Sequence, residues 1–364
     1  MTACDACLRR TALIAQLAPH VERGRRDRRK LSEMLSLPDE RLIDALAGDR
    51  RGAIVRAHAT FDPGGARERL VEASMRAVCR HDASYPPRML EADDAPAVLH
   101  VAGDVARLAI LTDRDVPAVA VVGARRAGAD GLSVARALGR GLAAAGVTVI
   151  SGMALGIDAA AHAGALEVGG PTITVLAGGA DVAYPASKRS LHRELVRSQA
   201  AISEMPPGFK PYRWCFPARN RTIAGLASMT IVVEAAERSG SLITADLAQE
   251  LGRAVGAVPG PVTASRCAGT NALLRDGAFV IRDAQDALDE ALGIGVATAL
   301  TGRRPEDLGA ALRSLLQRVE DGRDTVSSLA ATPSEAQHAL AGLAELELLG
   351  FVRRGPGGHY VRLL

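Results

Sequence analysis

The stretch 118–162 constrains the fold more than any other part of this sequence. It begins with an apolar run, 118–122, which ends at a glycine and a basic loop. A helical pattern over 130–145 follows, because apolar side chains recur there every three or four residues. A second β-rich run, 147–150, leads to another glycine and another helix. This order is the βαβ unit of a parallel sheet, whose loops lie where open α/β sheets bind ligands.

The same alternation continues to about residue 291. We expect strands near 118–122, 147–150, 172–176, 200–203, 229–233, 255–258 and 278–281. We expect helices near 130–145, 157–168, 188–198, 219–227 and 241–252. The sequence therefore predicts an α/β fold, a Rossmann-like doubly wound parallel sheet with helices on both faces.

Two smaller parts flank the predicted sheet. Apolar stripes in the first part predict a small helical bundle, whose last helix, 66–78, leads towards an additional strand at 97–101. We divide the chain into an N-terminal helical domain of SAM or helix-hairpin-helix type (1–72), the sheet domain (73–295), a linker (296–305) and a winged-helix domain (306–364).

The winged helix is predicted from three helical patterns and a β-hairpin. Its longest helix begins with a capping box, with Thr332 at N-cap, Pro333 at N1 and Glu335 at N3. Residues 309–364 hold six arginines and six acidic residues. Because such modules usually bind duplex DNA through basic residues, this neutral balance favours a protein-contact or structural role.

Composition excludes several classes of protein. No apolar run approaches the roughly 20 residues of a membrane span, and the N-terminus lacks the pattern of a secretory signal. We therefore expect a cytoplasmic protein with no membrane partner. The five cysteines are scattered; Cys4 and Cys7 have the spacing of half a zinc site, but no second pair has ligand spacing. Reduced thiols are favoured over a metal site.

Positive charge concentrates between residues 188 and 221, although the net charge of the chain is only +3. This segment holds eight basic residues against two acidic ones, and four of the ten aromatic residues. Aromatic residues interleaved with cations are typical of single-strand binding without sequence preference. The candidates are Lys210, Tyr212, Trp214, Arg219 and Arg221. Alternatively, Trp214 and Phe216 belong to the core.

A second basic run, 23–30, is interpreted as a solvated loop rather than an auxiliary phosphate contact.

The loops at the predicted strand ends point to anion binding. Residues 123–128 lack both the dinucleotide fingerprint and the P-loop pattern, so ATP and NAD are disfavoured and no cofactor is expected. Backbone N–H groups there, with Arg125, would bind a phosphate, unless the loop is only a tight turn. A predicted helix starts at Ser239, Gly240 and Ser241. These residues are an anion site at the helix N-terminus, or they serve only as its N-terminal cap. Several anion sites along one sheet edge favour a polynucleotide over a mononucleotide.

One pair of residues raises the question of catalysis. Asp158 and His162 are four residues apart on one predicted helix and share a face. One interpretation is a general-base pair. The other is that the aspartate interacts with the dipole at the start of the helix and the histidine is packed beneath the loop. The second interpretation is favoured, and no catalytic residue is assigned.

Seven blocks of sequence, in order, carry a resemblance to a known family. They are GARRAGADG, SGMALGIDAAAH, GGADVAYP, SEMPPG, FPARNRTIAGLA, VVEAAERSGSLITA and AVPG-P. Over about residues 80–285 the chain resembles the DNA-processing protein A (DprA/Smf) family. The resemblance implies an extended Rossmann domain that binds single-stranded DNA, usually as a homodimer. It further implies protection of incoming strands in natural transformation and loading of RecA in place of single-strand-binding protein.

The resemblance also assigns DNA-contacting positions. These fall on Gly123, Ala124, Arg125, Ser151, Gly152, Asn220, Arg221, Ser239 and Gly240, with Lys210 and a stacking Tyr212 or Trp214. With Arg219 and Ser241, which are chosen on charge and helix position, they make up the candidate single-stranded DNA site. Ala124 departs from the family, which often has serine there, so a hydroxyl contact is lost.

Two other classes of function compete with this one. Rossmann enzymes of the lysine-decarboxylase-like, nucleotide-hydrolysing type carry a P-G-G-x-G-T-x-x-E motif. The corresponding loop here is ERSGSLITA, and the two Pro-Gly-Gly triplets, 63–65 and 356–358, lie outside the sheet domain. That argues against hydrolysis, and the neutral winged helix argues against a transcription factor.

Overall fold

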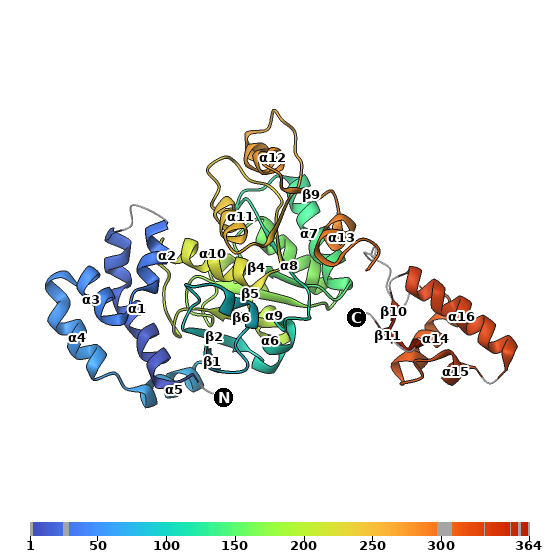
Figure 1. The fold of residues 1–364 in the computed structure, drawn as a ribbon, viewed down its shortest axis with the longest axis horizontal. Helices are drawn as coiled ribbons and strands as arrows, with labels where there is room; N and C mark the ends of the chain where they lie inside the picture. The colour runs from blue at the N-terminus through green and yellow to red at the C-terminus, as the bar shows by residue number, and fades with distance from the viewer. Residues whose placement is uncertain are drawn as a thin grey trace.

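A nine-stranded sheet forms the centre of the protein (Figure 1). The computed structural model describes residues 3–24, 29–296, 308–330, 332–349, 351–355 and 358–362. The strands of the sheet are β1 (Met75–Cys79), β2 (Val98–Gly103), β3 (Ala118–Val122), β4 (Thr148–Ser151), β5 (Thr172–Leu176), β6 (Ala200–Ser203), β7 (Met229–Val232), β8 (Ala254–Ala257) and β9 (Phe279–Val280). Their order is β1-β2-β6-β5-β4-β3-β7-β8-β9.

The sheet is parallel from β6 to β9, and β2 runs antiparallel to both β1 and β6. The chain passes from β3 through β4 and β5 to β6 in one direction, then returns to the other side of β3 with β7 and continues to β8 and β9. The strand order therefore reverses between β3 and β7. A crevice opens at such a switch point, beyond the carboxyl ends of the strands.

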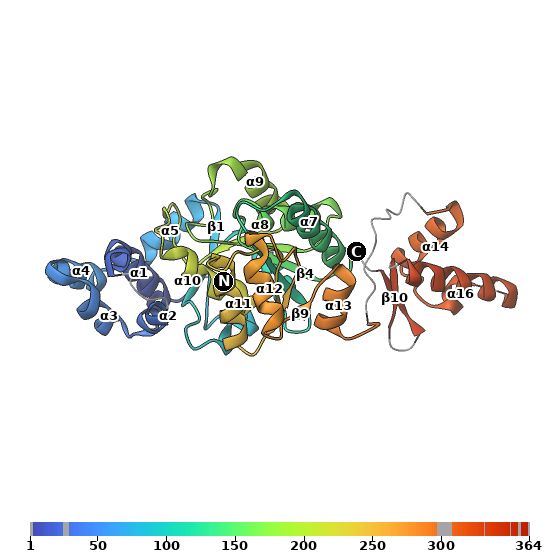
Figure 2. The same ribbon diagram turned by 90° about the horizontal axis from the view of Figure 1, so that it is seen from above.

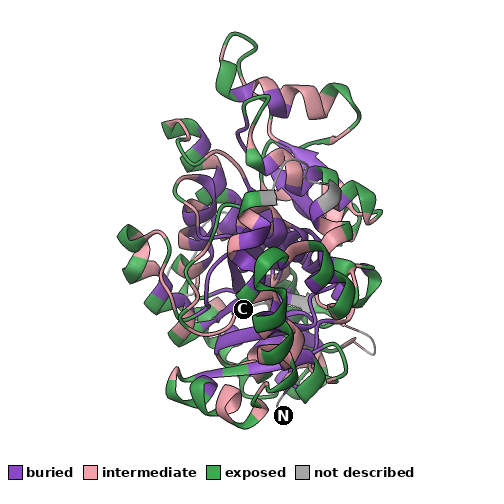
Figure 3. Ribbon diagram, turned by 90° about the vertical axis from the view of Figure 1, so that its left-hand side faces the viewer, coloured by how far each residue is buried: buried purple, intermediate pink, exposed green. Residues whose placement is uncertain are grey.

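Helices cover both faces of the sheet, as predicted. Those after β1 are α6 (Val105–Leu111), α7 (Ala129–Ala144), α8 (Ile157–Glu167), α9 (Arg189–Ser198), α10 (Cys215–Leu226), α11 (Gly240–Glu250), α12 (Ala268–Arg275) and α13 (Ala284–Leu292). Ala118, Ala120 and Val122 of β3 pack with α6, α10 and α11, whereas Val119 and Val121 pack with α7, α8 and α13. Burial on both faces explains the unbroken apolar strands, and Figure 3 shows the buried residues gathered in the sheet.

The helices α7 and α8 lie side by side in both ribbon views (Figures 1 and 2). A Cβ atom at Gly139 of α7 would lie 2.1 Å from the carbonyl oxygen of Ala161 in α8. The glycine is therefore required by the close approach of the two helices, which sets the position of the loops that precede them.

The N-terminal part is helical but does not stand apart from the sheet. Its helices are α1 (Asp5–Gly24), α2 (Arg29–Ser36), α3 (Asp39–Leu46), α4 (Arg51–Ala59) and α5 (Pro63–Glu72). Ala18, Val21, Leu31 and Leu35 form one buried cluster with Trp214. The Trp214 Nε1–H donates to the Ala18 carbonyl at 3.0 Å, and its backbone N–H donates to the Glu22 carboxylate at 3.1 Å. The middle of the basic run, residues 25–28, lies outside the described residues.

Two expected helix boundaries were wrong. The helix predicted over 66–78 ends at Glu72, and the chain turns at Ser74, which has a φ of 54°, into β1. Pairing of β1 with β2 overrides the helical pattern there. The helix predicted over 219–227 begins at Cys215, because Pro217 is tolerated in a first helical turn.

The C-terminal part has a core of its own. It contains α14 (Ala310–Glu320), α15 (Val326–Leu329), α16 (Pro333–Leu348) and an antiparallel hairpin of β10 (Val352–Arg354) and β11 (Tyr360–Arg362). Leu316, Leu343, Leu346 and Phe351 are buried in that core. The capping box at Thr332 is confirmed. Most of the expected linker, residues 297–305, lies outside the described residues. None of the described helices is both long and apolar enough to span a membrane.

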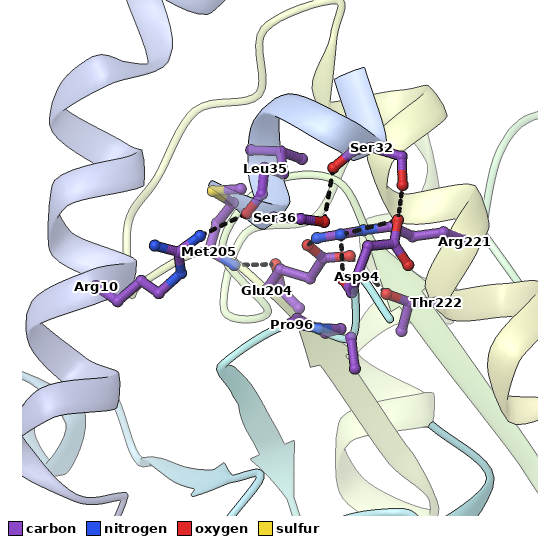
Figure 4. A network of polar contacts seen from close by, with 12 residues as sticks. Arg10, Ser32, Leu35, Ser36, Asp94, Pro96, Glu204, Met205, Arg221 and Thr222 are labelled. Carbon is purple, nitrogen blue, oxygen red and sulfur yellow. Dashed lines mark hydrogen bonds and ion pairs between the residues drawn. The ribbon is translucent and has the colours of Figure 1, made fainter. Parts of the chain in front are cut away.

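A buried ion cluster joins four parts of the chain (Figure 4). Arg221 of α10 pairs with Glu204, which follows β6, and with Asp94, which precedes β2. The Ser32 hydroxyl of α2 donates to Asp94, and the Thr222 hydroxyl donates to Glu204 at 2.5 Å. The Arg221 and Glu204 side chains are each only 8% exposed. Burial lowers the pKa of Arg221, but the two carboxylates outweigh it and raise that pKa overall.

We predict that Arg221→Met lowers the free energy of unfolding by about 3–5 kcal/mol, because it leaves buried carboxylates without a cation. Arg275→Met is the matched control, since the Arg275 side chain is 77% exposed in its ion pair with Asp276, and exposed pairs contribute at most about 1 kcal/mol. Urea unfolding followed through Trp214, the single tryptophan, measures both changes. Equal effects of the two substitutions would contradict the cluster's role.

Candidate nucleic-acid interface

A pocket of about 580 Å³ opens at the reversal point between β3 and β7. The loop after β3, the start of α8, the first turns of α10 and the start of α11 form its walls. Its lining includes the candidates Gly123, Arg125, Arg219, Asn220, Ser239, Gly240 and Ser241, together with Asp158, Phe216 and Thr244. Half of the candidate residues from the sequence therefore meet in one place.

Arg125 is the exposed cation of this pocket. Its guanidinium lies 5.0 Å from the centre of the Phe216 ring, within the range of a cation–π contact. The Phe216 ring lies 5.6 Å from the ring of Tyr184, which is 47% exposed. The sequence alone did not single out this pair, because Tyr184 follows β5 and lies outside the basic segment, and Phe216 was counted with the interleaved aromatics without being named a contact. A guanidinium beside one exposed ring and one half-buried ring has the chemistry to contact a phosphate and a base together.

The N-terminus of α11 forms the opposite wall. Ser239 caps the helix: its hydroxyl accepts from the Ser241 N–H at 3.4 Å and lies 2.8 Å from the Ser241 hydroxyl. The Asn220 amide donates to the Gly240 carbonyl at 3.2 Å and so joins α10 to this turn. Gly240 is exposed and has no atom within 4 Å of a Cβ position. The positive end of the helix dipole therefore faces open space in the pocket.

The anion position usual for a Rossmann fold is occupied by the protein itself. The Glu234 carboxylate, which follows β7, accepts from the Gly128 N–H at the start of α7, at 3.1 and 3.3 Å. A Cβ atom at Gly131 would lie 2.8 Å from the same carboxylate. A phosphate at this helix end would meet the Glu234 carboxylate, whose side chain is only 5% exposed, so this helix end is not free for an anion.

Several candidates serve the scaffold rather than the surface. The Ser151 hydroxyl is fully buried and donates to the Val121 carbonyl at 2.6 Å. The Ala124 N–H donates to the Glu234 carbonyl at 2.7 Å, and the Ala124 carbonyl accepts from Ile157 at 3.2 Å. Because these groups are already bonded, the expected phosphate contacts through the Ala124 N–H and the Ser151 hydroxyl do not fit the geometry.

Gly123 and Gly152 also leave space for protein atoms rather than for a ligand. A Cβ at Gly123 would lie 2.7 Å from Ile157, and one at Gly152 would lie 2.1 Å from the Arg219 guanidinium. Arg219 is buried and donates to the carbonyls of Gly152 and Val175, at 2.8 and 2.5 Å, which joins the ends of β4 and β5. Burial lowers the pKa of Arg219 to about 10, so it remains a cation at the floor of the pocket.

Trp214 and Arg221 face away from the pocket. Trp214 is fully buried beneath α1, which confirms the core interpretation and excludes a stacking role. Arg221 is held in the ion cluster with Glu204 and Asp94. Lys210 and Tyr212, in contrast, are exposed on the loop after β6, where the Tyr212 ring lies 6.1 Å from that of Phe209.

The pair Asp158 and His162 does not form a catalytic dyad. His162 is fully buried, its Nδ1 lies 2.8 Å from the Thr172 hydroxyl, and burial lowers its pKa to about 3. Asp158 accepts from the Ala154 N–H at 3.3 Å in the turn before α8, and burial raises its pKa although Arg219 opposes the shift. The favoured interpretation, a packed neutral histidine, fits this geometry.

Comparisons with known proteins point to one family. The family model for DNA recombination-mediator protein A matches residues 76–292. A putative DNA processing protein DprA from Mycobacterium tuberculosis is 41% identical over 256 residues, which are 70% of this chain and 64% of that protein. The alignment thus spans less than two thirds of that relative.

Two solved structures resemble this one. The X-ray structure of DprA from Streptococcus pneumoniae has a TM-score of 0.62 and 31% identity, over 80% of this chain and 99% of that one. DNA processing protein A from Helicobacter pylori, described for its single-stranded DNA binding mode, has a TM-score of 0.53 and 29% identity, over 60% of this chain and 95% of that one.

We predict that His162 makes folding sensitive to acid. Its pKa is about 3 in the folded state and 6.5 in the reference state, so between these values only the unfolded chain binds a proton and stability falls as pH falls. From pH 7 to pH 5, protonation of the unfolded chain at this residue lowers the free energy of unfolding by about 2 kcal/mol. His162→Gln removes this pH dependence, whatever the substitution does to stability at pH 7. Urea unfolding at both pH values measures the difference, with His338→Gln on the exposed face of α16 as control. An unchanged pH dependence in His162→Gln would contradict the buried neutral state.

Proposed function

This chain belongs to the DNA recombination-mediator protein A family, and we propose from that premise that it binds single-stranded DNA without sequence preference and mediates recombination. In this role it protects incoming strands during natural transformation and helps to load RecA onto them. The observation that carries the proposal is the exposed Arg125 over the half-buried Phe216 ring, which lines one pocket together with the start of α11.

The chemistry of the pocket suits a nucleotide chain better than an isolated anion. Arg125 supplies charge, Phe216 supplies an aromatic face and α11 supplies a helix N-terminus. Base stacking on such rings tolerates every base, because each base has a π-face. The arrangement therefore supports binding through phosphates and stacking.

A binding track extends from this pocket across the sheet edge. The loop with Lys210 and Tyr212 follows β6, and the loop with Ser239 follows β7, four strand positions away in the order β6-β5-β4-β3-β7. At about 4.8 Å per strand this edge is about 19 Å long, enough for several nucleotides. We assign direct contacts to Arg125, Lys210, Tyr212, Phe216, Asn220, Ser239 and Gly240. The remaining candidates are buried or already bonded and position the track; they are Gly123, Ala124, Ser151, Gly152, Trp214, Arg219, Arg221 and Ser241.

We propose that the chain is not an enzyme. Glu234 is engaged with Gly128 and Arg266, and His162 is buried and neutral. The nucleotide-hydrolysing alternative needs its glycine-rich motif at the sheet edge, but Pro63-Gly64-Gly65 forms the first turn of α5. The second triplet lies partly outside the described residues.

Further features belong to the same proposal. The exposed Phe279 and Val280 on the edge strand β9 offer a surface for a homodimer, since an unpaired apolar edge favours association. The three helices and hairpin of the C-terminal part have the element order of a winged helix, which we assign to a protein contact. RecA and single-strand-binding protein are the proposed partners, in the cytoplasm.

We predict that Arg125→Ala and Lys210→Ala each weaken binding to a labelled single strand. Each should reduce the log–log salt slope by about 0.7, because each removes one neutralised phosphate. Arg76→Ala is the matched control, because Arg76 is exposed near the amino end of the edge strand β1, whereas the proposed track follows the carboxyl ends of the strands. Fluorescence anisotropy across a salt titration measures affinity and slope. If the variant with both Arg125→Ala and Lys210→Ala has the same affinity and salt slope as Arg76→Ala, the proposed interface is wrong. It is also wrong if duplex DNA binds better than the single strand.

We predict a different signature for Phe216→Leu. Loss of a stacking ring should cost about 1–3 kcal/mol of binding free energy with the salt slope unchanged. Phe216→Tyr keeps the ring and should retain affinity. The same titration separates the two effects, and a changed slope in Phe216→Leu would show that the ring acts only by positioning Arg125.

A further inference from the structure

Four metal-ligating side chains converge at the junction of α1 and β1. Cys4 precedes the first turn of α1 and Cys7 lies within that turn, Cys79 is the last residue of β1, and His81 lies two residues beyond it. Their Sγ and ring nitrogen atoms all lie within 4.8 Å of one another. The His81 Nδ1 lies 3.5 Å from the Cys4 sulfur and 3.5 Å from the Cys7 sulfur.

The backbone holds the two halves of this cluster together. The Ala3 N–H donates to the Ala77 carbonyl at 3.0 Å, which adds the N-terminal segment to the edge of β1. The Cys4 N–H points at the Cys79 sulfur at 3.5 Å. A backbone N–H directed at a sulfur stabilises its thiolate form, as the outer contacts of metal sites commonly do.

The distances between the four ligand atoms fit a single tetrahedrally coordinated metal ion. With Zn–S bonds of about 2.3 Å and Zn–N bonds of about 2.0–2.1 Å, a tetrahedron has S–N edges of about 3.6 Å and S–S edges of about 3.8 Å. The two S–N distances of 3.5 Å agree with the first value, and the 4.8 Å limit includes the second. An iron–sulfur cluster places several atoms between its ligands and needs wider spacing.

We propose that Cys4, Cys7, Cys79 and His81 bind one structural Zn²⁺ ion. Three thiolates and one imidazole are a closed ligand set of the structural type, and soft ligands in this geometry select zinc over hard cations. This replaces the expectation of plain thiols from the sequence. That expectation considered only cysteine pairs, whereas the second half of the site is a Cys-x-His pair at the end of a strand.

The ion fixes the helical layer to the sheet. Cys7 and Leu8 of α1 pack with Met75 of β1 and Val98 of β2 in one core, and the last turns of the helix accept hydrogen bonds from Trp214. Because Cys7 and Cys79 lie 72 residues apart in the chain, the metal closes a large loop between α1 and β1 and adds to these contacts. The site lies apart from the pocket at Arg125, so its role is separate from the proposed DNA contacts.

The test begins with the metal content of the full chain purified without chelator. We expect one zinc per chain by mass spectrometry, and replacement by Co²⁺ should give the intense visible bands of a tetrahedral thiolate site. Cys4→Ser and His81→Asn, at the two more exposed positions, should lose the metal. His81→Cys restores a fourth ligand and should retain it. Cys215→Ser and Cys267→Ser are matched controls elsewhere in the fold and should keep full occupancy.

Thermal unfolding with a zinc chelator gives an independent readout. The chelator should lower the midpoint of the native chain and of Cys267→Ser, but not that of Cys4→Ser. A chain without zinc that has free thiols at Cys4, Cys7 and Cys79 and binds no added Zn²⁺ or Co²⁺ would overturn the proposal. A Cys4–Cys7 disulfide in freshly purified protein, or zinc retained in both Cys4→Ser and His81→Asn, would also overturn it.

Discussion

The parallel pairing of β3 with β7 decides where the crevice of this protein opens. The ladder from Val119–Met229 to Val122–Val232 brings two loops, more than a hundred residues apart in the chain, to the same sheet edge. One loop supplies Arg125 and the other supplies Glu234 and the cap of α11. The Glu234 carboxylate fills the start of α7, so the same pairing that creates the crevice also blocks the helix end that Rossmann folds usually use for an anion.

The three arginines among the candidate site residues differ in burial, which the sequence pattern did not reveal. Arg219 and Arg221 lie two residues apart on α10, yet both are buried and satisfied by carbonyls or carboxylates. If a buried guanidinium is removed, its buried partners lose their hydrogen bonds or counter-charge, which costs a large desolvation free energy. These two arginines therefore stabilise the fold. Arg125 is exposed over Phe216 and can bind a phosphate at little structural cost.

The sequence predicted the scaffold well, because its strands are short apolar runs with glycines or polar residues at their ends. Every strand from 118–122 to 278–281 was anticipated to within two residues, since burial on both faces leaves a clear signal. Boundaries were wrong at 66–78, where strand pairing overrode helical periodicity, and at the start of α10, where the helix includes Pro217 in its first turn. The structure brings half of the candidate site residues into one pocket, but the sequence did not separate the exposed candidates from the buried ones.

The sequence by itself determined the doubly wound sheet, the glycine-rich strand ends, the basic and aromatic segment and the family. The tertiary structure decided which side chains are accessible: Trp214 is core, Arg221 is paired, and the half-buried Phe216 lies beside the exposed Tyr184. It also brought Cys79 and His81 to Cys4 and Cys7. The reason is physical, since periodicity records only whether a position is apolar. Burial, hydrogen bonding and ligand geometry depend on partners that are distant in the chain and meet only when the sheet is assembled.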